Sequence, residues 1–562
     1  MIKKAYLDFV RGQVIGRDTA FRTPFGIRHM FYADYTASGR ALAFIEKKIL
    51  AILASYANTH TEDDYSGRYL TRLFHGAEER IKRLVNAGPN GKIFAVGSGS
   101  TGALKKLQEI IGVYIPPVAR ERLDGLCEAA RRAGADISAA AALAKPIVFI
   151  GPYEHHTNEL MWREAFVDTV VIKLAGDGGL DLDDLDRRLS DPSCRERSRF
   201  GSFSAGSNIT GVRTPVYDVA RICHRHGVPV FFDFAAVAPY IEIDMNRDSE
   251  SYFDAVFFSP HKFLGGPGSC GVLVMNERLY RIDLPPTTAG GGTVVYVGPT
   301  HHDYSRDIET RETAGTPPIL QTIRAALAME VKDKIGVKAI EHIEAGHLKY
   351  FLQGLASIEG LELVGRYDRP GLTPIISFNL RHRDRILHPK FVTKLLNDLF
   401  GIQSRAGCSC AGPYGHALLE IDEETSQRFR GVISCGLEGI KPGWVRINLH
   451  YTFTRKDLDF LLASVRFVAR EGHQFIRRYA FDFRTGEWSA AGHSDGGAEF
   501  SADADFSVRK IDPARVEALR AGYFRAAEAE ARRLSRMPEP KFVADEKNIE
   551  ALKNFYYALR IR

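Results

Sequence analysis

Asp233 and Lys262 are the two side chains of this sequence whose types and surroundings are best suited to chemistry. Asp233 follows the apolar run Val230-Phe231-Phe232, and Lys262 ends the run Phe257-Phe258-Ser259-Pro260-His261-Lys262. A lysine amine can hold an aldehyde as an imine, and a buried carboxylate can keep a pyridine nitrogen protonated. Each residue alone is better explained as a surface lysine or a turn aspartate. Together they meet the two demands of pyridoxal phosphate, which we therefore expect as a cofactor.

Both residues are expected at one edge of a sheet. Residues 228–232 and 254–258 form short apolar runs bounded by turn residues, which is typical of buried strands. In an open α/β sheet, ligands bind beyond the carboxyl ends of the strands. Asp233 follows the first strand and residues 259–262 follow the second, so the pattern places them at that edge.

Strand and helix patterns alternate from about residue 90 to residue 275. The strand candidates are residues 93–96, 147–150, 169–172, 200–204, 228–232, 254–258 and 271–275. Seven such strands predict a mostly parallel sheet in an α/β domain. Residues 116–145, rich in Ala and Arg, interrupt the alternation and are expected to form one or two surface helices as an insertion.

The C-terminal half predicts a smaller α+β domain. A helical region runs to about residue 355, apolar strand candidates follow at 373–380 and 444–449, and a helix is expected at 455–471. Further on we expect a hairpin and loop at 476–507 and a long helix that begins at Asp512-Pro513 and ends before Pro538. The expected organisation is an N-terminal segment (1–29), a large domain (30–320), a small domain (321–475) and a C-terminal extension (476–562).

Composition excludes several classes of protein. The 562 residues are 45% hydrophobic, and 75 basic against 69 acidic residues give a net charge of +6 without a basic tract of the kind that binds nucleic acid. No run of 18 apolar residues suggests a membrane span. The cysteines are odd in number, at seven, and follow no secretory leader, so a reducing cytoplasmic compartment is expected.

Three further segments carry polar groups at predicted strand ends. Residues 97–102, Gly-Ser-Gly-Ser-Thr-Gly, follow a strand and begin a helix, so their amides and the Ser100 and Thr101 hydroxyls suit a phosphate group. A plain connection is the alternative. His155 can stack on a cofactor ring or carry protons, and Asn208 can donate to a ring hydroxyl or a substrate carboxylate. Either is otherwise an ordinary structural residue.

The segment from Arg405 to Pro413 combines a carboxylate binder with two thiols, Cys408 and Cys410. This pattern favours an amino-acid substrate and sulfur chemistry. The alternatives are a pair of inert cysteines, or a metal site completed by His416. Because two thiols in a Cys-x-Cys arrangement are no zinc signature, we expect no metal.

Taken in order, these motifs resemble the class V aminotransferase family of fold-type I pyridoxal phosphate enzymes, and within it the cysteine desulfurase and selenocysteine lyase branch. The resemblance spans about residues 30 to 470. The motifs that carry it are Tyr32-Ala33-Asp34-Tyr35-Thr36-Ala37-Ser38, Glu154-His155-His156, Ser207-Asn208-Ile209-Thr210-Gly211, Asp233, Ser259-Pro260-His261-Lys262, Gly290-Gly291-Gly292-Thr293 and Arg311-Glu312-Thr313-Ala314-Gly315-Thr316-Pro317.

The resemblance implies a role for each matching residue. Lys262 would hold the cofactor, Asp233 would face its ring nitrogen and His155 would stack on the ring. The residues implied around the phosphate and ring hydroxyl are Ser100, Thr101, Asn208, Ser259 and His261. Thr293 would reach the phosphate of a neighbouring subunit, so a homodimer is expected.

The resemblance also implies the substrate contacts. Arg405 would hold the substrate carboxylate with help from Arg446, and Ala37 and His60 complete the substrate-binding candidates. Cys410 stands where the desulfurase nucleophile stands. The sequence departs from the family at Ala236, where glutamine or histidine usually faces the ring hydroxyl, and the family has no fixed requirement for Cys408.

The expected reaction is desulfuration of L-cysteine. The Lys262 amine would take the α-proton, and the Cys410 thiolate would attack the substrate sulfur, giving a persulfide and L-alanine, with a sulfur-acceptor protein as a possible partner. An aminotransferase, an epimerase or a C–S β-lyase would need Lys262 and Asp233 but no thiol. A scaffold or sulfur-carrier partner that has lost efficient chemistry is the remaining alternative.

Overall fold

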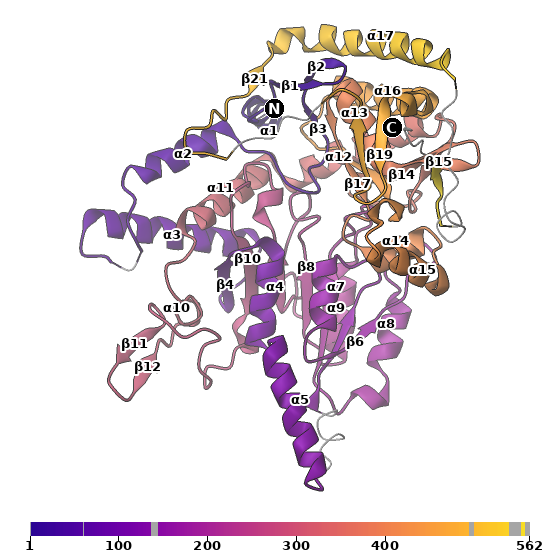
Figure 1. The fold of residues 1–562 in the computed structure, drawn as a ribbon. Coiled ribbons are helices and arrows are strands. Elements are labelled where there is room, and N and C mark those ends of the chain that lie inside the picture. Colours follow the sequence, from indigo (N-terminus) through magenta and orange to yellow (C-terminus); the bar gives the residue numbers. More distant parts are fainter. Residues whose placement is uncertain (1, 60, 136–143, 494–499, 539–551, 557–562) are drawn as a thin grey trace. The chain divides into compact units, whose positions relative to one another are not determined.

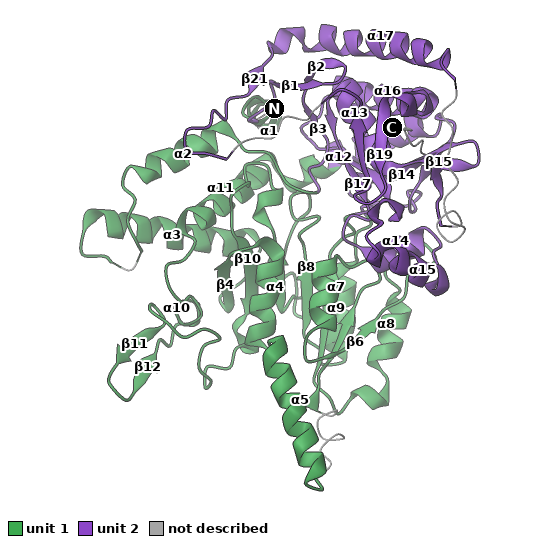
Figure 2. Cartoon of the chain, viewed as in Figure 1, with its two compact units in different colours: residues 1–13, 37–208, 212–341 green, residues 14–36, 209–211, 342–562 purple. Residues whose placement is uncertain are grey.

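The computed structural model describes residues 2–59, 61–135, 144–493, 500–538 and 552–556 (Figure 1). The chain divides into two compact units (Figure 2). Unit 1 comprises residues 1–13, 37–208 and 212–341, and unit 2 comprises residues 14–36, 209–211 and 342–562. These boundaries run differently from the four expected segments, because residues 14–36 and the C-terminal extension both join unit 2.

Unit 1 is built on the seven strands expected from the sequence: β4 (Gly91–Val96), β5 (Ile147–Ile150), β6 (Asp168–Val171), β7 (Arg199–Ser204), β8 (Val230–Asp233), β9 (Ala255–Phe258) and β10 (Gly271–Asn276). They lie in the order β4-β10-β9-β8-β7-β5-β6. Strands β5 to β9 pair in parallel, and β10 runs antiparallel to both β4 and β9. The prediction of a mostly parallel seven-stranded sheet is confirmed.

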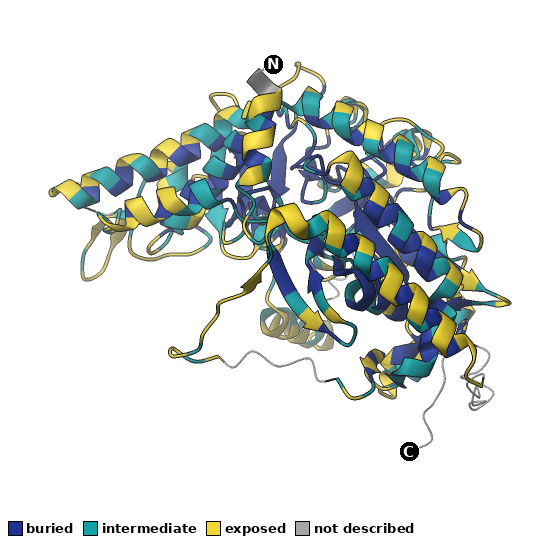
Figure 3. Cartoon of the chain, turned by 90° about the horizontal axis from the view of Figure 1, so that it is seen from above, coloured by how far each residue is buried: buried dark blue, intermediate teal, exposed yellow. Residues whose placement is uncertain are grey.

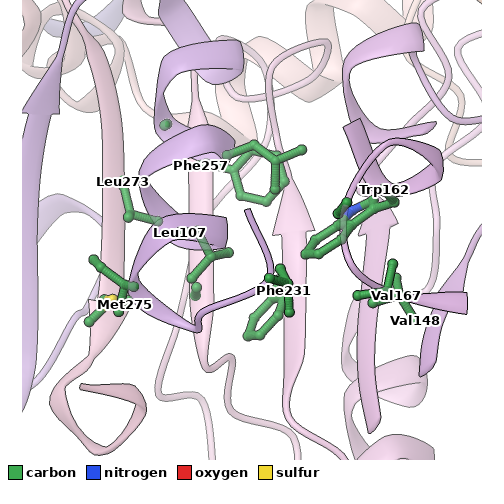
Figure 4. Packing of buried hydrophobic residues seen from close by; sticks show 14 of the residues in the cluster. Leu107, Val148, Trp162, Val167, Phe231, Phe257, Leu273 and Met275 are labelled. Atoms are coloured by element: carbon green, nitrogen blue, oxygen red, sulfur yellow. The ribbon is translucent and has the colours of Figure 1, made fainter. Parts of the chain in front are cut away.

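Helices α4 (Gly99–Ile110) and α7 (His156–Arg163) pack on one face of this sheet. Their Leu107 and Trp162 meet Phe231 and Phe257 from the central strands (Figure 4). All four residues of β8 and all four of β9 are buried, because helices cover both sheet faces in such folds. That double burial explains the unbroken apolar runs in the sequence.

In the described part of unit 1 the remaining helices are α1 (Ile2–Gly12), α2 (Ala43–Leu53), α3 (Tyr65–Leu84), α5 (Pro117–Arg132), α8 (Leu182–Leu189), α9 (Val216–Arg225), α10 (Ile308–Arg311) and α11 (Ile319–Ile335). Helix α11 packs against α3. Helix α5 has no buried residue, in keeping with the expected insertion. The helical region that follows residue 318 divides at Gly336, whose φ of 90° ends α11 before α12 (Val337–Leu355) begins.

Unit 2 has an α+β fold. Its main sheet follows the order β17-β18-β14-β15-β22, and β13 pairs with β14. The strands are β13 (Leu361–Leu363), β14 (Ile375–His382), β15 (Arg385–Leu387), β17 (Arg405–Gly407), β18 (Trp444–Asn448) and β22 (Phe555–Tyr556). Its helices are α13 (Pro389–Phe400), α14 (Gly412–Leu418), α15 (Glu423–Ser434), α16 (Arg455–Glu471) and α17 (Val516–Ser535). Two short strands, β3 (Phe31–Tyr32) and β16 (Ile402–Gln403), pair in parallel.

The C-terminal extension packs within unit 2. Strands β19 (Tyr479–Asp482) and β20 (Glu487–Ala490) form the expected hairpin. Strand β21 (Arg509–Lys510) joins β1 (Thr19–Thr23), which pairs with β2 (Gly26–His29). Asp512 caps a short 3-10 turn that leads into α17. The Tyr523 hydroxyl of α17 accepts the His29 N–H at 2.9 Å. Helices with one buried and one exposed face surround the buried strands (Figure 3).

Within the described ranges, no helix is both long enough and apolar enough to cross a lipid bilayer.

We expect the stability of unit 2 to fall in acid because of His388. Its Nδ1 accepts the Trp488 indole N–H at 3.2 Å and its Nε2 bonds to the Gly439 carbonyl at 3.3 Å, so the buried ring is neutral. Burial lowers the pKa of His388 from 6.5 to about 3. Below pH 6.5 the His388 side chain binds a proton in the unfolded chain but not in the folded one. The free energy of unfolding therefore falls by up to about 1.4 kcal/mol per pH unit.

The measurement is the pH dependence of thermal unfolding, followed through the buried Trp488. His388→Asn keeps an acceptor for the indole and cannot titrate, so its melting temperature should vary less than the wild-type one between pH 6.5 and 5. Equal slopes for the two proteins would contradict the assignment.

Candidate active site

Several polar side chains of unit 1 lie at the carboxyl edge of its sheet. Ser204 ends β7 directly beside Asp233, which ends β8, and Asp233 in turn pairs in register with Phe257 of β9. Lys262 follows β9 through a single 3-10 turn. The fold therefore brings together at one edge the residues that the sequence placed at strand ends.

Asp233 is a buried carboxylate, with 4% of its surface exposed. Its Oδ1 accepts the Ala235 N–H at 2.8 Å. Burial raises the pKa of Asp233 from 3.8 to about 6, while the backbone hydrogen bond and the charge of Lys262 act in the opposite direction. A cation brought to this carboxylate would keep it ionised.

The turn that carries Lys262 is held in place by the segment 38–39. The Gly39 N–H and the Ser38 hydroxyl both donate to the His261 carbonyl, at 2.9 and 3.2 Å. A Cβ at Gly39 would lie 2.0 Å from the Phe263 carbonyl oxygen, so only glycine allows this approach. Burial, with the charge of Lys262, lowers the pKa of His261 to about 4, which leaves its ring neutral at pH 7.

The N-terminus of α4 faces the same turn. The Ser100 N–H donates to Ser259 Oγ at 2.8 Å, and the Thr101 and Thr157 hydroxyls share a hydrogen bond of 2.8 Å that joins α4 to α7. Gly99 has a φ of 56°, and a Cβ there would come within 2.8 Å of Ser259 Oγ. A Cβ at Gly97 would meet nothing within 4 Å, so open space adjoins these donors. The arrangement suits an anionic group.

His155 caps α7, and its Nδ1 accepts the Thr157 N–H at 3.1 Å. With Nδ1 used as an acceptor, the neutral ring carries its proton on Nε2. The half-buried ring is thus fixed by its own helix, as a ring that stacks on a cofactor would need to be.

Glu154, for which the sequence predicts no role of its own, is the centre of a buried network of hydrogen bonds. Its carboxylate accepts the Gly151 N–H at 3.0 Å, the Ser204 N–H at 2.8 Å, the Ser204 hydroxyl at 2.5 Å and the Asn158 amide at 2.7 Å. Burial raises the pKa of Glu154 to about 7, and the nearby Asp233 charge adds to the rise. The signal in the sequence that could have identified Glu154 is its place between two apolar strands and directly before His155.

Glu154→Gln is expected to lower the free energy of unfolding by about 2–3 kcal/mol, because either orientation of the amide turns an N–H toward an N–H donor. Glu159→Gln in α7 is the matched control, since Glu159 pairs with the half-exposed Arg163 and should cost about 1 kcal/mol or less. Chemical denaturation of both variants measures the difference. Equal costs would show that the Glu154 network contributes little.

The other expected residues of unit 1 are placed as follows. Asn208 is buried, in a tight loop where the Ser207 N–H donates to the Val212 carbonyl at 2.8 Å. Thr293 is fully buried and its hydroxyl donates to the Gly290 carbonyl at 2.7 Å. Ala37 is half-buried, beside the Ser38 contact to His261. His60 lies outside the described residues.

Unit 2 brings together the expected substrate arginines. Arg405 of β17 and Arg446 of β18 are direct neighbours across the two strands. Arg405 is exposed, whereas Arg446 has 3% of its side chain exposed and donates to Asp34 Oδ1 at 2.8 Å. Burial lowers the pKa of Arg446, and the charges of Asp34 and Cys410 oppose that change. The Arg446 guanidinium and the Cys410 side chain therefore lie within range of each other's charge.

Cys408 and Cys410 lie on the loop after β17. Cys408 is exposed and Cys410 is half-buried, and both are free thiols. Among the residues that the structure describes, no group of three or more His, Cys, Asp or Glu side chains is arranged to hold a metal ion.

Comparison with known proteins points to one family. A family model described as Aminotransferase class-V matches residues 136–461. A probable cysteine desulfurase of Halalkalibacterium halodurans is 27% identical over 389 residues, covering 68% of this chain and 84% of the relative. A probable cysteine desulfurase of Streptomyces coelicolor is 26% identical over 393 residues, with coverage of 68% and 84%.

Solved structures show the same fold. A cysteine desulfurase from Thermococcus onnurineus in its apo form superposes with a TM-score of 0.62 at 20% identity, covering 82% of this chain and 98% of that chain. The Escherichia coli cysteine desulfurase CsdA superposes with a TM-score of 0.57 at 21% identity, covering 77% and 93%.

Proposed function

This chain belongs to the class-V aminotransferase family of pyridoxal phosphate enzymes, and from that premise we propose that it is a cysteine desulfurase that converts L-cysteine to L-alanine and a protein persulfide. The relatives named as probable cysteine desulfurases support this choice. The observation that carries it is the free, half-buried thiol of Cys410 on the loop after β17, which also carries Arg405, because an aminotransferase has no use for a thiol there.

The residues of unit 1 fit the cofactor. The buried Asp233 offers a carboxylate to a protonated ring nitrogen, His155 offers a fixed ring for stacking, and the α4 N-terminus next to Ser259 offers donors for a phosphate. Lys262 provides the amine that holds the aldehyde. Bound there, pyridoxal phosphate would supply an electron sink for negative charge at the α-carbon of an amino acid.

In the proposed reaction Arg405 and Arg446 bind the substrate carboxylate through their guanidinium N–H groups. The Lys262 amine, released when the substrate binds, removes the α-proton and later returns a proton to the product. Asp233 would face the ring nitrogen of the cofactor, and His155 would stack on its ring. The surroundings of each group within its own unit support these roles.

Sulfur transfer is assigned to Cys410. Its thiolate attacks the sulfur of the substrate, so the sulfur–sulfur bond forms as the bond from that sulfur to the substrate β-carbon breaks. The electron pair stays on the β-carbon, which is then protonated to give L-alanine. In the balance, the Cys410 thiol and L-cysteine become the Cys410 persulfide and L-alanine, and no oxidant is needed.

The test of this function is a product analysis with the purified, cofactor-loaded protein. Incubation with L-cysteine and a thiol reductant should give L-alanine and sulfide in equal amounts. Pyruvate with sulfide and ammonia would instead indicate a β-lyase, and 3-mercaptopyruvate would indicate transamination. No product despite bound cofactor would favour the scaffold alternative that Ala236 suggested.

We further propose a homodimer that uses the hairpin of β11 (Val294–Val297) and β12 (His302–Tyr304). Val295, Tyr296 and Val297 are 72%, 53% and 64% exposed, which is unusual for three consecutive apolar residues of one strand. Val295→Asp/Val297→Asp should therefore shift the sedimenting species from two chains to one. Leu126→Asp, at a 66% exposed site on α5, is the matched control and should leave the mass unchanged. A double variant that stays dimeric would place the interface elsewhere.

The proposed reaction also implies a setting and a partner. All seven cysteines are free, and Cys410 must be a thiol at the start of each cycle, so we propose a reducing, cytoplasmic compartment. A protein or small molecule with its own thiol would then take the sulfur.

A further inference from the structure

The two thiols of the loop after β17 share one tight turn. The Ala411 N–H donates to the Cys408 carbonyl at 3.3 Å, which closes a β-turn over residues 408–411. Its central residues, Ser409 and Cys410, have φ values of 51° and 60°. Positive φ at both central positions defines a type I′ turn, which normally uses asparagine, aspartate and glycine.

Neither central residue is of the type that the turn prefers. A non-glycine residue in the left-handed region costs about 1–2 kcal/mol, and this turn accepts that cost twice. The buried Ser409 holds the middle of the turn against unit 2. This strained turn holds Cys408 and Cys410 together.

The spacing within the turn places the Cα atoms of the two cysteines at a separation that a disulfide can span. In helical backbone of either hand, Cα atoms two residues apart are about 5.4 Å from each other. Two cysteines can join their sulfurs when their Cα atoms are about 4.4–6.8 Å apart. A sulfur atom can therefore pass between the two thiols once both side chains turn toward each other.

Charge and exposure differ between the two thiols. The half-buried Cys410 lies in the field of Arg446, which Asp34 anchors at 2.8 Å. Cys408 is exposed. Cys408 is therefore the thiol that a second molecule can approach more easily.

We propose that Cys408 is a second sulfur carrier, which receives the sulfur from the Cys410 persulfide and presents it to the acceptor. The proposal rests on the proposed desulfurase function. The Cys408 thiolate attacks the outer sulfur of the persulfide, so a sulfur–sulfur bond forms at Cys408 as the one at Cys410 breaks. The electron pair leaves with Cys410 Sγ as a thiolate beside Arg446, and the thiol proton of Cys408 passes to solvent. The exchange consumes no oxidant or reductant.

A single-turnover experiment tests the relay in the cofactor-loaded protein. Wild type, Cys408→Ser and the control Cys435→Ser each receive one equivalent of L-cysteine without reductant, and dithiothreitol is then added as the acceptor. Cys435 is exposed and follows α15. We expect the same amount of L-alanine from all three proteins, but release of sulfide to dithiothreitol at least tenfold slower from Cys408→Ser. Fragment-ion mass spectrometry should place the sulfur on Cys408 in wild type and on Cys410 in the variant.

The outcomes separate the two proposals. L-alanine from every protein with equally fast sulfide release from Cys408→Ser, and wild-type sulfur found only on Cys410, would overturn the relay and leave the desulfurase intact. No L-alanine from wild type would overturn the desulfurase function and the relay with it.

A second measurement examines the geometry without any turnover. Diamide treatment of the cofactor-loaded protein in the absence of substrate should join Cys408 to Cys410, with loss of two hydrogens and of both alkylation sites, in wild type and in Cys435→Ser. If both thiols stay open to alkylation, the two sulfurs do not meet and the relay is excluded.

Discussion

Lys262→Ala is expected to reduce L-alanine formation from L-cysteine by about 10⁴-fold or more, because in the proposed reaction this one side chain both holds the cofactor and moves the α-proton. General acid–base catalysis alone contributes about 10²–10⁴-fold. Lys262 sits on a turn fixed by Gly39 and Ser38, and no other lysine of this turn can replace it. Steady-state rates at saturating L-cysteine measure the effect, and the visible absorbance of the protein reports the lost linkage to the cofactor.

The control is Lys105→Ala, at an exposed lysine of α4 that pairs with Glu109. It should retain the wild-type rate. A small primary amine added to Lys262→Ala should restore part of the activity, since it replaces the missing base without replacing the tether. Retention of more than a tenth of the wild-type rate by Lys262→Ala would exclude this lysine from the chemistry.

Cys410→Ala is expected to lower sulfide and L-alanine formation by at least about 10³-fold while the protein keeps its cofactor. The Cys410 thiolate is the first acceptor for the substrate sulfur in the proposed reaction, so its removal leaves that sulfur without an acceptor. The visible spectrum should still respond to L-cysteine, because Lys262 and Asp233 remain in place. Loss of products together with an intact spectral response is therefore the diagnostic result.

Cys435→Ala provides the comparison for Cys410→Ala, as an exposed cysteine of the same unit. It should behave as wild type. If Cys410→Ala keeps its turnover, the thiol has no part in the reaction and the enzyme is an aminotransferase, an epimerase or a C–S β-lyase, all of which work without it.

The seven strands of unit 1 and the helix α16 are evident from local pattern. Strands buried on both faces are nearly all apolar, so β8 and β9 stand out without any knowledge of their neighbours. Helix α16 begins at residue 455 as expected, because Thr454 and Asp457 form a capping box within four residues. Asp233 and Lys262 could be placed for the same reason, since each directly follows such a strand.

Contacts between residues far apart in the chain could not be predicted from the sequence. The Arg446–Asp34 pair and the union of β1 with β21 join segments hundreds of residues apart, and no local pattern encodes such partners. The two-unit division follows from these contacts. The hydrogen-bond network of Glu154 could not be predicted for the same reason, because its donor Ser204 lies on a different strand.

The sequence by itself determined which residues can do chemistry, the strands and helices that carry them and the family to which the chain is similar, because these depend on residue type and on short-range periodicity. Only the tertiary structure decided the surroundings of each group: the buried donors around Glu154, the Gly39 approach behind Lys262, the Arg446 charge near Cys410 and the strained turn that pairs Cys408 with Cys410. Burial, strand register and positive φ depend on packing between distant segments. These three features determine the charge of each group at a site, the atoms that it can contact and how readily it reacts.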